Sequence, residues 1–363
     1  MYENNGPEYL RRHVIGSDLC TNCGACVNIC PYFASYRDRT VVLDDCNRIE
    51  GDCFDVCPRT PTDFPSLKSL LFNEKDLTTE VGALKAFYIT RAKDEHIRKS
   101  TQHGGTVTSL VDLALASGVV DAAVLSGISE PLLPCGIVLR EAGQASRFGR
   151  SNFVVSPTIA KFNELAREEA VKSIAVVATP CQALALAKMR INPSARTKAR
   201  SDKLSLVIGI FCGWALSWTP FKELISKKVD LNSIIGMDIP PSRYNSFEVK
   251  TVMGEVHISL DELRSCIRPS CSYCSDMTAE FSDVSIGSAR LQEGWEEAQG
   301  WNQVIVRTNA GQKLLSLAKK EGILEFREVP DGNLEKLKKA SDAKKRRGME
   351  NLAAREKRNR IVR

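Results

Sequence analysis

The sequence of 363 residues contains no hydrophobic run that could cross a membrane. None of its apolar stretches reaches the roughly 18 to 20 residues that a transmembrane helix requires. The first residues, MYENNGPEYLRRHVIGSD, also lack the apolar core of a signal peptide. These absences predict a cytoplasmic protein with no direct insertion into a membrane.

Two common nucleotide-binding motifs are missing as well. The chain has no GxGxxG sequence and no Walker-type phosphate loop, so the usual dinucleotide and P-loop signatures are absent. The composition, with 43% hydrophobic and 26% charged residues, is that of an ordinary globular protein. The length is sufficient for two or three domains.

Positive charge is concentrated near the end of the sequence. Residues 335–363 contain 12 Lys or Arg and four Asp or Glu, a local charge of +8 in a chain whose net charge is +6. Such a segment can bind nucleic acid, an acidic cofactor or an acidic partner, or it can be a solvated helix. We expect no nucleic-acid partner.

Cysteine, in contrast, is abundant. Of the 13 cysteines, seven lie between residues 20 and 57 and Cys135 stands alone. The other five are Cys181, Cys212, Cys266, Cys271 and Cys274. Ferredoxin-like spacing in a chain without a secretion signal indicates metal ligation in a reducing compartment rather than disulfide bonds.

The stretch CTNCGACVNICP, which begins at Cys20, has the cysteine spacing of bacterial-type ferredoxins. In that arrangement the fourth cysteine of each half ligates the cluster of the other half. We therefore expect one 4Fe–4S cluster to be held by Cys20, Cys23, Cys26 and Cys57.

The second half of the ferredoxin repeat, DDCNRIEGDCFDVCPRTP, lacks one cysteine. Two of the ligand positions hold Asn47 and Glu50, and one cysteine is displaced by a single residue. The thiolates left for a second cluster are Cys30, Cys46 and Cys53.

Three interpretations of this incomplete set are open. It can bind a three-iron cluster, or a 4Fe–4S cluster completed by Asp45, Asp52, water or a distant cysteine such as Cys266. Alternatively the site is empty and its cysteines are small buried hydrophobes. We expect two clusters in this region, because three correctly phased cysteines would be unusual in an empty site.

From about residue 83 onward the sequence has an α/β pattern. Strands are predicted for LKAFYITRA, VVDAAVLSG, SIAVVATP, LSLVIGIFC and NQVIVRT. Helices are predicted for GGTVTSLVDLALASG, AGQKLLSLAKKEG and the basic end of the chain. The stretches SFEVKTVMG and EVHISL flank a hairpin turn at Met253-Gly254.

A second group of cysteines is dispersed over this α/β region. Cys181 and Cys212 each follow a predicted buried strand, and CIRPSCSYCSD contains a CxxC pair. If the two strands are parallel, both thiolates emerge at the sheet edge where α/β proteins place their ligands. The CxxC loop could complete a four-thiolate site for a cluster or for zinc. The alternative is that these cysteines are buried structural residues.

A glycine-containing turn suggests a cofactor site. In STQHGGTVTSLVDLAL, backbone amides before a helix could face a phosphate, with Thr106, Thr108 and Ser109 as further donors. Glycine in such a turn can also serve geometry alone. The Gly/Ser-rich turn in DVSIGSARLQEGW could approach a cofactor in the same way.

Taken together, these stretches resemble the beta subunits of coenzyme F420-reducing hydrogenase and F420-dependent formate dehydrogenase. QHGGTVTSLVDLAL, ATPCQALAL, GIFC, CIRPSCSYCSDMTAEFSDVSIGS and QVIVRT occur in the order seen in that family. The resemblance runs from about residue 83 into the C-terminal helix. Relatives with a fused N-terminal ferredoxin, including the input subunit of F420H2 dehydrogenases, resemble the whole chain.

The resemblance implies an α/β domain that binds FAD and one 4Fe–4S cluster, with coenzyme F420 exchanging a hydride with the flavin. It implies the cluster ligands Cys181, Cys212, Cys271 and Cys274. No catalytic side chain is expected, because FAD carries the chemistry. The expected flavin contacts are polar residues and glycines in the corresponding loops: Gln102, His103, Gly104, Gly105, Thr106, Thr108, Ser109, Ser156, Thr179, Ser285, Gly287 and Ser288.

We therefore predict four segments. Residues 1–60 form a small ferredoxin-like α+β domain that binds Fe–S clusters, and residues 61–82 form a linker or arm. Residues 83–330 form the α/β domain for FAD and a 4Fe–4S cluster, and residues 331–363 form a basic C-terminal helix.

The predicted function is an electron-input or electron-output subunit with two or three Fe–S clusters. Its expected partners are subunits of a hydrogenase, formate dehydrogenase or heterodisulfide-reductase-like complex. We expect the tail cations Lys344, Lys345, Arg346 and Arg347 to attract the acidic groups of coenzyme F420. One alternative is a stand-alone, ferredoxin-dependent flavin reductase of an organic substrate. Another is a non-catalytic electron-transfer or scaffold subunit that has lost its flavin.

Overall fold

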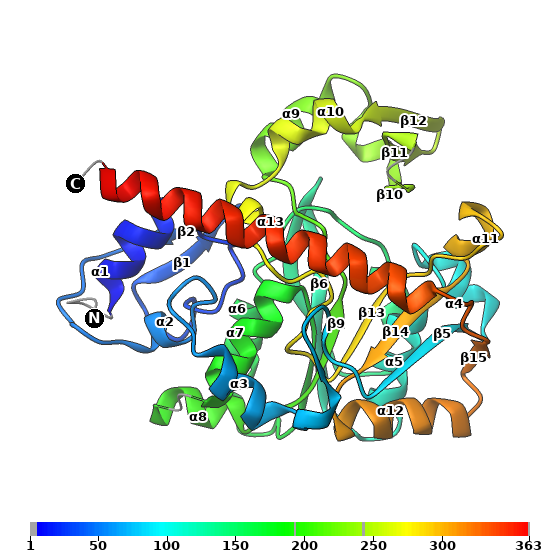
Figure 1. Cartoon of the computed structure of the whole chain (residues 1–363), viewed down its shortest axis with the longest axis horizontal. Helices are drawn as coiled ribbons and strands as arrows, with labels where there is room; N and C mark the ends of the chain where they lie inside the picture. The colour runs from blue at the N-terminus through cyan, green and yellow to red at the C-terminus, as the bar shows by residue number, and fades with distance from the viewer. Residues whose placement is uncertain (1–5, 192–193, 242–243, 362–363) are drawn as a thin grey trace.

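An eight-stranded mixed sheet forms the centre of the structure (Figure 1). The computed structural model describes residues 6–361 except 192–193 and 242–243, so the ends of the predicted first and last segments lie outside the described residues. In spatial order the strands are β15 (Leu324–Arg327), β5 (Ala86–Ala92), β14 (Asn302–Val306), β13 (Val284–Ser288), β9 (Leu204–Ile210), β8 (Ile174–Ala178), β6 (Ala122–Glu130) and β7 (Leu133–Leu139).

The four middle strands β13, β9, β8 and β6 are parallel to one another, and antiparallel pairs complete both margins. The apolar runs that predict strands form β5, β6, β8, β9 and β14, which confirms those predictions. Two marginal strands, β7 and β15, were not predicted. The segment interpreted as a cofactor turn begins with strand β13, because VSIGS pairs with β9 on one side and with β14 on the other.

Helices cover both faces of the sheet. On one face, α5 (Thr106–Ala116) and α12 (Asn309–Lys320) pack on β6, β9, β13 and β14. On the other face, α6 (Thr158–Leu165) and α7 (Pro180–Ile191) pack on β6, β8 and β9. The predicted α5 ends as expected, because Gly118 adopts a left-handed conformation with φ of 66° directly after its last turn.

The N-terminal segment is built from short elements. They are α1 (Pro7–Tyr9), the π-helix η1 (Leu10–Ile15), the hairpin of β1 (Phe33–Tyr36) and β2 (Arg39–Val42), and α2 (Asp52–Asp55). Buried residues Cys23, Ala25, Ile29 and Val56 belong to the same apolar cluster as α6 and α7. The N-terminal segment therefore shares a continuous core with the α/β region.

The predicted arm contains α3 (Phe64–Leu71), η2 (Glu74–Asp76) and the small ladder of β3 (Leu77–Thr78) with β4 (Gly82–Ala83). The division of the chain into four domains remains a prediction.

A three-stranded sheet stands apart from the main sheet, near the top of Figure 1. It consists of β10 (Ile234–Asp238), β11 (Ser246–Thr251) and β12 (Gly254–Ser259), with α9 (Trp218–Ser226) and α10 (Leu260–Leu263) beside it. Strands β11 and β12 pair around the predicted turn, which confirms the hairpin. Trp218, Phe221 and Phe247 belong to a separate apolar cluster beneath it.

Several further short helices connect these elements. They are α4 (Glu95–Ser100), η3 (Ala145–Phe148), α8 (Ala195–Ser201), η4 (Leu231–Ser233), η6 (Arg264–Cys266), η7 (Pro269–Tyr273) and α11 (Trp295–Gln299). Across the described part of the chain, no helix combines the length and the apolar character that a membrane span needs.

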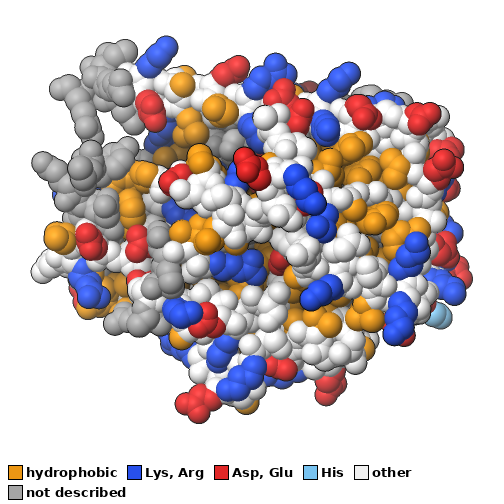
Figure 2. Space-filling model, turned by 60° about the horizontal axis from the view of Figure 1, so that its bottom comes forward, with side chains coloured by type: hydrophobic (Ala, Val, Ile, Leu, Met, Phe, Trp, Pro, Cys, Tyr) orange, Lys and Arg blue, Asp and Glu red, His pale blue; other side chains and the backbone are white. Residues whose placement is uncertain are grey.

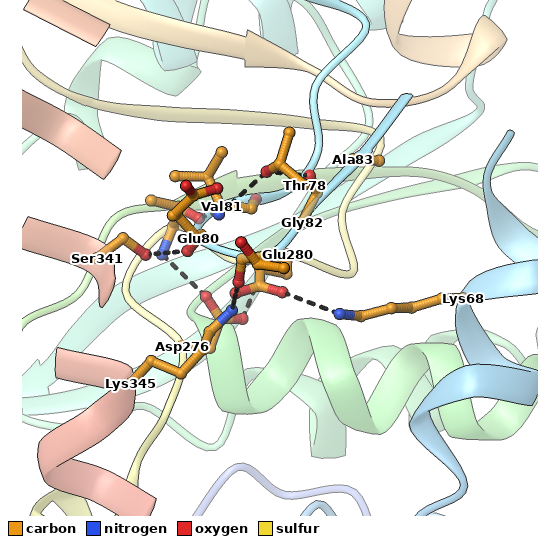
Figure 3. Close-up of polar contacts among 12 residues, drawn as sticks. Lys68, Thr78, Glu80, Val81, Gly82, Ala83, Asp276, Glu280, Ser341 and Lys345 are labelled. Carbon is orange, nitrogen blue, oxygen red and sulfur yellow. Dashed lines mark hydrogen bonds and ion pairs between the residues drawn. The ribbon is translucent and has the colours of Figure 1, made fainter. Parts of the chain in front are cut away.

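The predicted C-terminal helix is α13 (Asn333–Ile361), which crosses the molecule from the β15 side to the N-terminal segment (Figure 1). A cluster of polar side chains connects α13 to the arm (Figure 3). Ser341 Oγ donates to Glu80 O at 2.6 Å, and Lys345 Nζ lies 2.7 Å from Glu280 Oε1. Lys68 of α3 approaches the same carboxylate, with Nζ 3.7 Å from Oε2.

Arg307 is the largest fully buried side chain beneath this group. Its guanidinium donates to the carbonyls of Val81, Ala83 and Thr278 at 2.6 to 2.9 Å. It also donates to Ser285 Oγ at 2.9 Å. Burial lowers the pKa of Arg307 to about 10, which leaves it a cation at neutral pH. One side chain thus joins the arm, β13 and the segment after the CxxC pair.

Replacing this cation should destabilise the fold. Arg307→Met leaves several buried carbonyls without a donor, so we expect the free energy of unfolding to fall by about 3 kcal/mol or more. Anaerobic thermal unfolding monitored by circular dichroism measures the change. The control Arg140→Met removes an exposed partner of Glu168 and should cost less than about 1 kcal/mol. Equal effects of the two changes would contradict the structural role of Arg307.

Candidate redox site

Cys181 and Cys212 lie at one edge of the main sheet. Cys181 is in the first turn of α7, directly after β8, and Cys212 follows β9. Strands β8 and β9 are parallel neighbours, so their carboxyl ends meet at this edge. The structure confirms that prediction. Thr179 Oγ1 lies 3.3 Å from Cys181 Sγ, which fixes this sulfur next to the end of β8.

The CxxC loop reaches the same edge. Cys212 N donates to Met277 O at 2.9 Å, and Ala215 N donates to Cys271 Sγ at 3.3 Å. Burial raises the pKa of the Cys212 thiol, and the neighbouring thiols of Cys271, Cys181 and Cys274 raise it further. The four cysteines that the family resemblance implies as ligands therefore form one half-buried group.

The spacing of the sulfurs fits a cluster better than a single zinc ion. Among the described residues, Glu248, Glu255 and His257 are the one group of three or more metal-ligating side chains whose ligand atoms all lie within 4.8 Å of one another. Two thiolates on one tetrahedral zinc would be about 4 Å apart, because each Zn–S bond is about 2.3 Å. A cluster interposes iron and sulfide between its thiolates and suits the wider spacing.

The first N-terminal set, Cys20, Cys23, Cys26 and Cys57, also forms one group. Burial raises the pKa of Cys26, and the thiols of Cys20, Cys23 and Cys57 add to the rise. Burial likewise raises the pKa of Cys23. The Cys181 thiol makes the second-largest contribution to this rise. This N-terminal set therefore adjoins the group at the sheet edge.

The cysteines of the incomplete set, Cys30, Cys46 and Cys53, also lie near one another. Burial raises the pKa of Cys53 to about 12, and the thiols of Cys30 and Cys46 add to the rise. Cys266 is not part of this set, because it is buried beside Trp218 and Phe221 under the three-stranded sheet. The suggestion that Cys266 completes a second cluster is therefore wrong. The carboxylate, water, three-iron and empty-site interpretations stay open.

Three cations that the sequence did not single out join the N-terminal segment to the sheet edge. The guanidinium of Arg59 donates to Ser270 O at 2.6 Å and to Tyr273 O at 3.0 Å, on either side of Cys271. Its own amide donates to Cys57 Sγ at 3.4 Å. One residue thus contacts a ligand of the N-terminal set and the loop of the other set.

Lys188 and Arg268 act across the same boundary. Buried Lys188 of α7 donates from Nζ to Cys57 O at 2.9 Å and to Thr60 Oγ1 at 2.7 Å. Buried Arg268 donates to Cys20 O at 3.3 Å and to the carbonyl and carboxylate of Asp38. These bonds fix the two cysteine sets relative to each other.

One face of α13 covers the CxxC loop. Lys344 Nζ donates to Cys212 O at 2.6 Å, and Asn351 Nδ2 donates to Ser272 O at 2.8 Å. Between them, a Cβ on Gly348 would lie 2.5 Å from Cys274 O. Arg355, one turn further along, contacts Tyr273. The spacing of these residues places them on one side of the helix.

This arrangement corrects the role expected for two of the four tail cations, Lys344 and Lys345. Lys344 and Lys345 are bonded to Cys212 O and Glu280, and Arg346 pairs with Asp342 of its own helix. Lys344 and Lys345 are therefore not free to attract an acidic coenzyme, whereas Arg346 and Arg347 are exposed and their expected role stays a prediction. On the face shown in Figure 2, Lys and Arg side chains are interspersed with Asp and Glu, which is typical of an ordinary globular surface.

The flavin residues expected around the glycine turn occupy the start of α5. Gly105 is left-handed, with φ of 78°, and a Cβ on Gly104 would lie 2.9 Å from Asn302 Oδ1. The first helical amide, that of Thr106, already donates to Asn302 Oδ1, and its hydroxyl bonds to Thr90. Packing therefore accounts for both glycines and for Thr106.

Other atoms in this region have no partner. Among the described residues, His103 Nδ1, Ser109 Oγ and Trp295 Nε1 are buried without a hydrogen bond. The rings of His103 and Trp295 lie 5.6 Å apart, edge to face. Gln102 Nε2 donates to Asp238 Oδ1 at 2.7 Å, and Thr108 is buried in the same helix as Ser109. A polar ligand that reaches these atoms would satisfy them.

The remaining flavin candidates fall into two places. Gly287 and Ser288 lie at the carboxyl end of β13, where Asn302 Nδ2 donates to Gly287 O at 3.4 Å, whereas Ser285 is bonded to Arg307. Ser156 and Thr179 are both bonded to Gln182, beside Cys181. Both places are at the sheet edge that carries the cysteines.

Three protein-family patterns match parts of the chain. The N-terminal part of the beta subunit of coenzyme F420 hydrogenase/dehydrogenase matches residues 87–160, and the C-terminal part of the same beta subunit matches residues 171–332. A 4Fe–4S binding domain matches residues 13–35.

Individual relatives share this pattern. The beta subunit of coenzyme F420 hydrogenase from Methanothermobacter thermautotrophicus is 29% identical over 280 residues, which cover 76% of this chain and 96% of that protein. The F subunit of F(420)H(2) dehydrogenase from Methanosarcina mazei is 27% identical over 350 residues, which cover 93% of each. The coenzyme F420-dependent sulfite reductase of Methanocaldococcus jannaschii is 26% identical over 98% of this chain, which spans 53% of that protein.

A solved structure has the same fold. A chain of the F420-reducing NiFe hydrogenase complex from Methanosarcina barkeri matches with a TM-score of 0.70 at 23% identity. The match covers 77% of this chain and 94% of that chain. It supports the mixed α/β fold, whereas the ferredoxin-like region corresponds to the 4Fe–4S match.

The close contact of α13 with the CxxC loop should be sensitive to one methyl group. Gly348→Ala raises helix propensity by up to about 1 kcal/mol but places a Cβ against the Cys274 carbonyl. We expect the helix to be displaced and the iron content of the protein purified without oxygen to fall by about four atoms per chain, one cube.

The matched control is Met349→Ala, which changes the next residue on the exposed side of the same helix. Its iron content should equal that of the unchanged protein. Full iron content in Gly348→Ala would show that α13 does not need this contact to close over the loop.

Proposed function

The chain belongs to the family of coenzyme F420 hydrogenase/dehydrogenase beta subunits and carries an additional 4Fe–4S domain, and from this premise we propose an iron–sulfur flavoprotein that passes electrons between coenzyme F420 and a partner. Named relatives are F420-dependent oxidoreductases or their subunits, which supports the same reaction class here. The expected partners are other subunits of a redox complex.

The observation that carries this proposal is the contiguity of the two complete cysteine sets. Arg59 contacts both sets, and the Cys181 thiol adds to the rise that burial causes in the pKa of Cys23. Two cluster sites that lie next to each other suit one-electron transfer between them. The incomplete set adjoins the complete N-terminal set, because Cys53 lies near Cys57.

FAD fits the polar atoms at the sheet edge. His103, Ser109 and Trp295 offer unsatisfied buried atoms, and the carboxyl end of β13 is a usual ligand position in α/β folds. When bound, FAD supplies hydride exchange with a two-electron carrier and release of single electrons. The residues of the chain hold the cofactors, orient them and exclude water.

The stand-alone reductase of an organic substrate is a second hypothesis. The sulfite reductase relative is about twice as long as the region that this chain matches. The sulfite reductase relative therefore contains further sequence that this chain does not match. Stable co-purification with a component of a hydrogenase, formate dehydrogenase or disulfide reductase would exclude the stand-alone function.

Purification without oxygen, followed by counts of iron, sulfide and flavin, tests the proposal directly. We expect one FAD per chain and about 12 irons if all three sites hold cubes, about 11 if the incomplete set holds three irons, and about eight if that set is empty. Reduced coenzyme F420, NADH and reduced ferredoxin are then compared as donors. Absence of flavin, or bleaching by ferredoxin alone, would contradict the proposal.

The contact between the N-terminal segment and α7 can be tested by changing Lys188. Lys188→Met removes the buried donor to Cys57 O and Thr60 Oγ1, so the N-terminal segment should lose its fixed position against α7. After rapid mixing with reduced coenzyme F420, we expect flavin reduction at an unchanged rate and slower reduction of the N-terminal clusters, followed by freeze-quench electron paramagnetic resonance.

The control Lys198→Met removes an exposed lysine that pairs with Asp202 on α8. It should leave both rates unchanged. Unchanged cluster reduction in Lys188→Met would show that this contact does not position the clusters.

A further inference from the structure

Lys344 is a buried cation on the inner face of α13. The residue is 5% exposed, and its ammonium donates to the carbonyl of Cys212 at 2.6 Å. Cys212 is one of the four cysteines at the sheet edge. The charge of Lys344 is therefore placed directly against the proposed cluster site.

No carboxylate forms an ion pair with Lys344 within the part of the chain that the structure describes. The anionic groups that act on it are the cysteine sulfurs of Cys274, Cys212 and Cys271, together with the nearby carboxylate of Asp276. Burying an ammonium without a close counter-charge is costly. The sulfurs of Cys274, Cys212 and Cys271, together with Asp276, are the counter-charges that this position provides.

The next residue shows a different arrangement. Lys345 Nζ lies 2.7 Å from Glu280 Oε1 and 2.6 Å from Thr79 O. Its charge is neutralised by a buried carboxylate and serves to fasten the helix to the arm. Two adjacent lysines of one helix thus face different partners, and only Lys344 faces the cysteines.

We propose that Lys344 raises the reduction potential of the cluster held by Cys181, Cys212, Cys271 and Cys274, and that α13 is therefore part of the redox site. The inference rests on the cluster of the proposed function. Four thiolates outweigh the positive charge of a cluster core, so reduction adds an electron to an anionic group. A fixed cation stabilises the reduced state more than the oxidised state, and the low local dielectric strengthens this effect.

The other charges near the site do not replace Lys344. Arg59 acts on Cys181 and Cys271 from the N-terminal side, where it is bonded to the carbonyls of Ser270 and Tyr273. Asp276 opposes the cations, and its carboxylate accepts hydrogen bonds from the amides of Thr278 and Glu280. Lys344 is the cation that donates to the backbone of a cysteine in the set.

The test is an anaerobic redox titration of the full-length, cluster-loaded protein monitored by electron paramagnetic resonance. Three variants are compared with the unchanged chain. Lys344→Met removes both the charge and the donor, and Lys344→Gln removes the charge but keeps an N–H donor toward Cys212. Arg347→Met removes an equal charge from the exposed side of the same turn.

In both Lys344 variants, we expect the ratio of reduced to oxidised cluster at a fixed potential to fall about tenfold for one titration step, equivalent to about 59 mV for a one-electron couple. The other titration steps and the Arg347→Met protein should match the unchanged chain. Such a pattern assigns the effect to the buried charge.

Three results would overturn the inference. The first is an unchanged potential in Lys344→Gln, which would mean that hydrogen bonding and not charge sets the potential. The second is loss of about four irons in both Lys344 variants, which would make the residue structural only. The third is an equal shift in Arg347→Met. A failure of the proposed function would be seen earlier, as an unchanged chain without the corresponding cluster signal.

Discussion

The parallel pairing of β8 with β9 is the constraint on which the candidate redox site depends. Because the two strands run in the same direction, the residues that follow them emerge side by side at one sheet edge, which brings Cys181 next to Cys212. The backbone bond from Cys212 to Met277 then brings the CxxC loop to the same edge. The N-terminal segment approaches through Cys23, and α13 closes over the loop.

Long cationic side chains connect the segments that meet at this sheet edge. Arg59, Lys188 and Lys344 each donate to a backbone carbonyl at or beside a cysteine. A carbonyl acceptor holds a charged donor in place without neutralising its charge, so the charge remains available to the thiolates. Carboxylate-paired cations such as Lys345 and Arg140 lie away from the sulfurs and serve packing or the surface.

The sequence predicted the parts of the structure that are encoded locally. Apolar runs located the central strands, and ferredoxin spacing separated Cys20, Cys23, Cys26 and Cys57 from the incomplete set. The direction of β8 and β9, which decides whether Cys181 and Cys212 meet, followed only from the assumption of a parallel sheet. Marginal strands β7 and β15 were missed, since short, partly exposed strands have weak patterns.

The contacts between distant segments could not be predicted. Lys188 bonds to Cys57 across 131 positions of the chain, and no local pattern distinguishes it from a surface lysine. Polar residues of β13 suggested a cofactor turn, but Ser285 is bonded to Arg307, which only the three-dimensional arrangement reveals. The expected role of Lys344 and Lys345 was misjudged for the same reason, because the charge of a helix does not show which of its faces is buried.

Gly348 has a consequence for the maturation of the protein. The helix that carries it is synthesised after both cysteine segments that it covers, so the four thiolates stay open to cluster delivery until α13 docks. The close approach to the Cys274 carbonyl leaves no room for a Cβ at this position of the helix. Because α13 packs over the CxxC loop, that loop can be covered only once α13 has been synthesised.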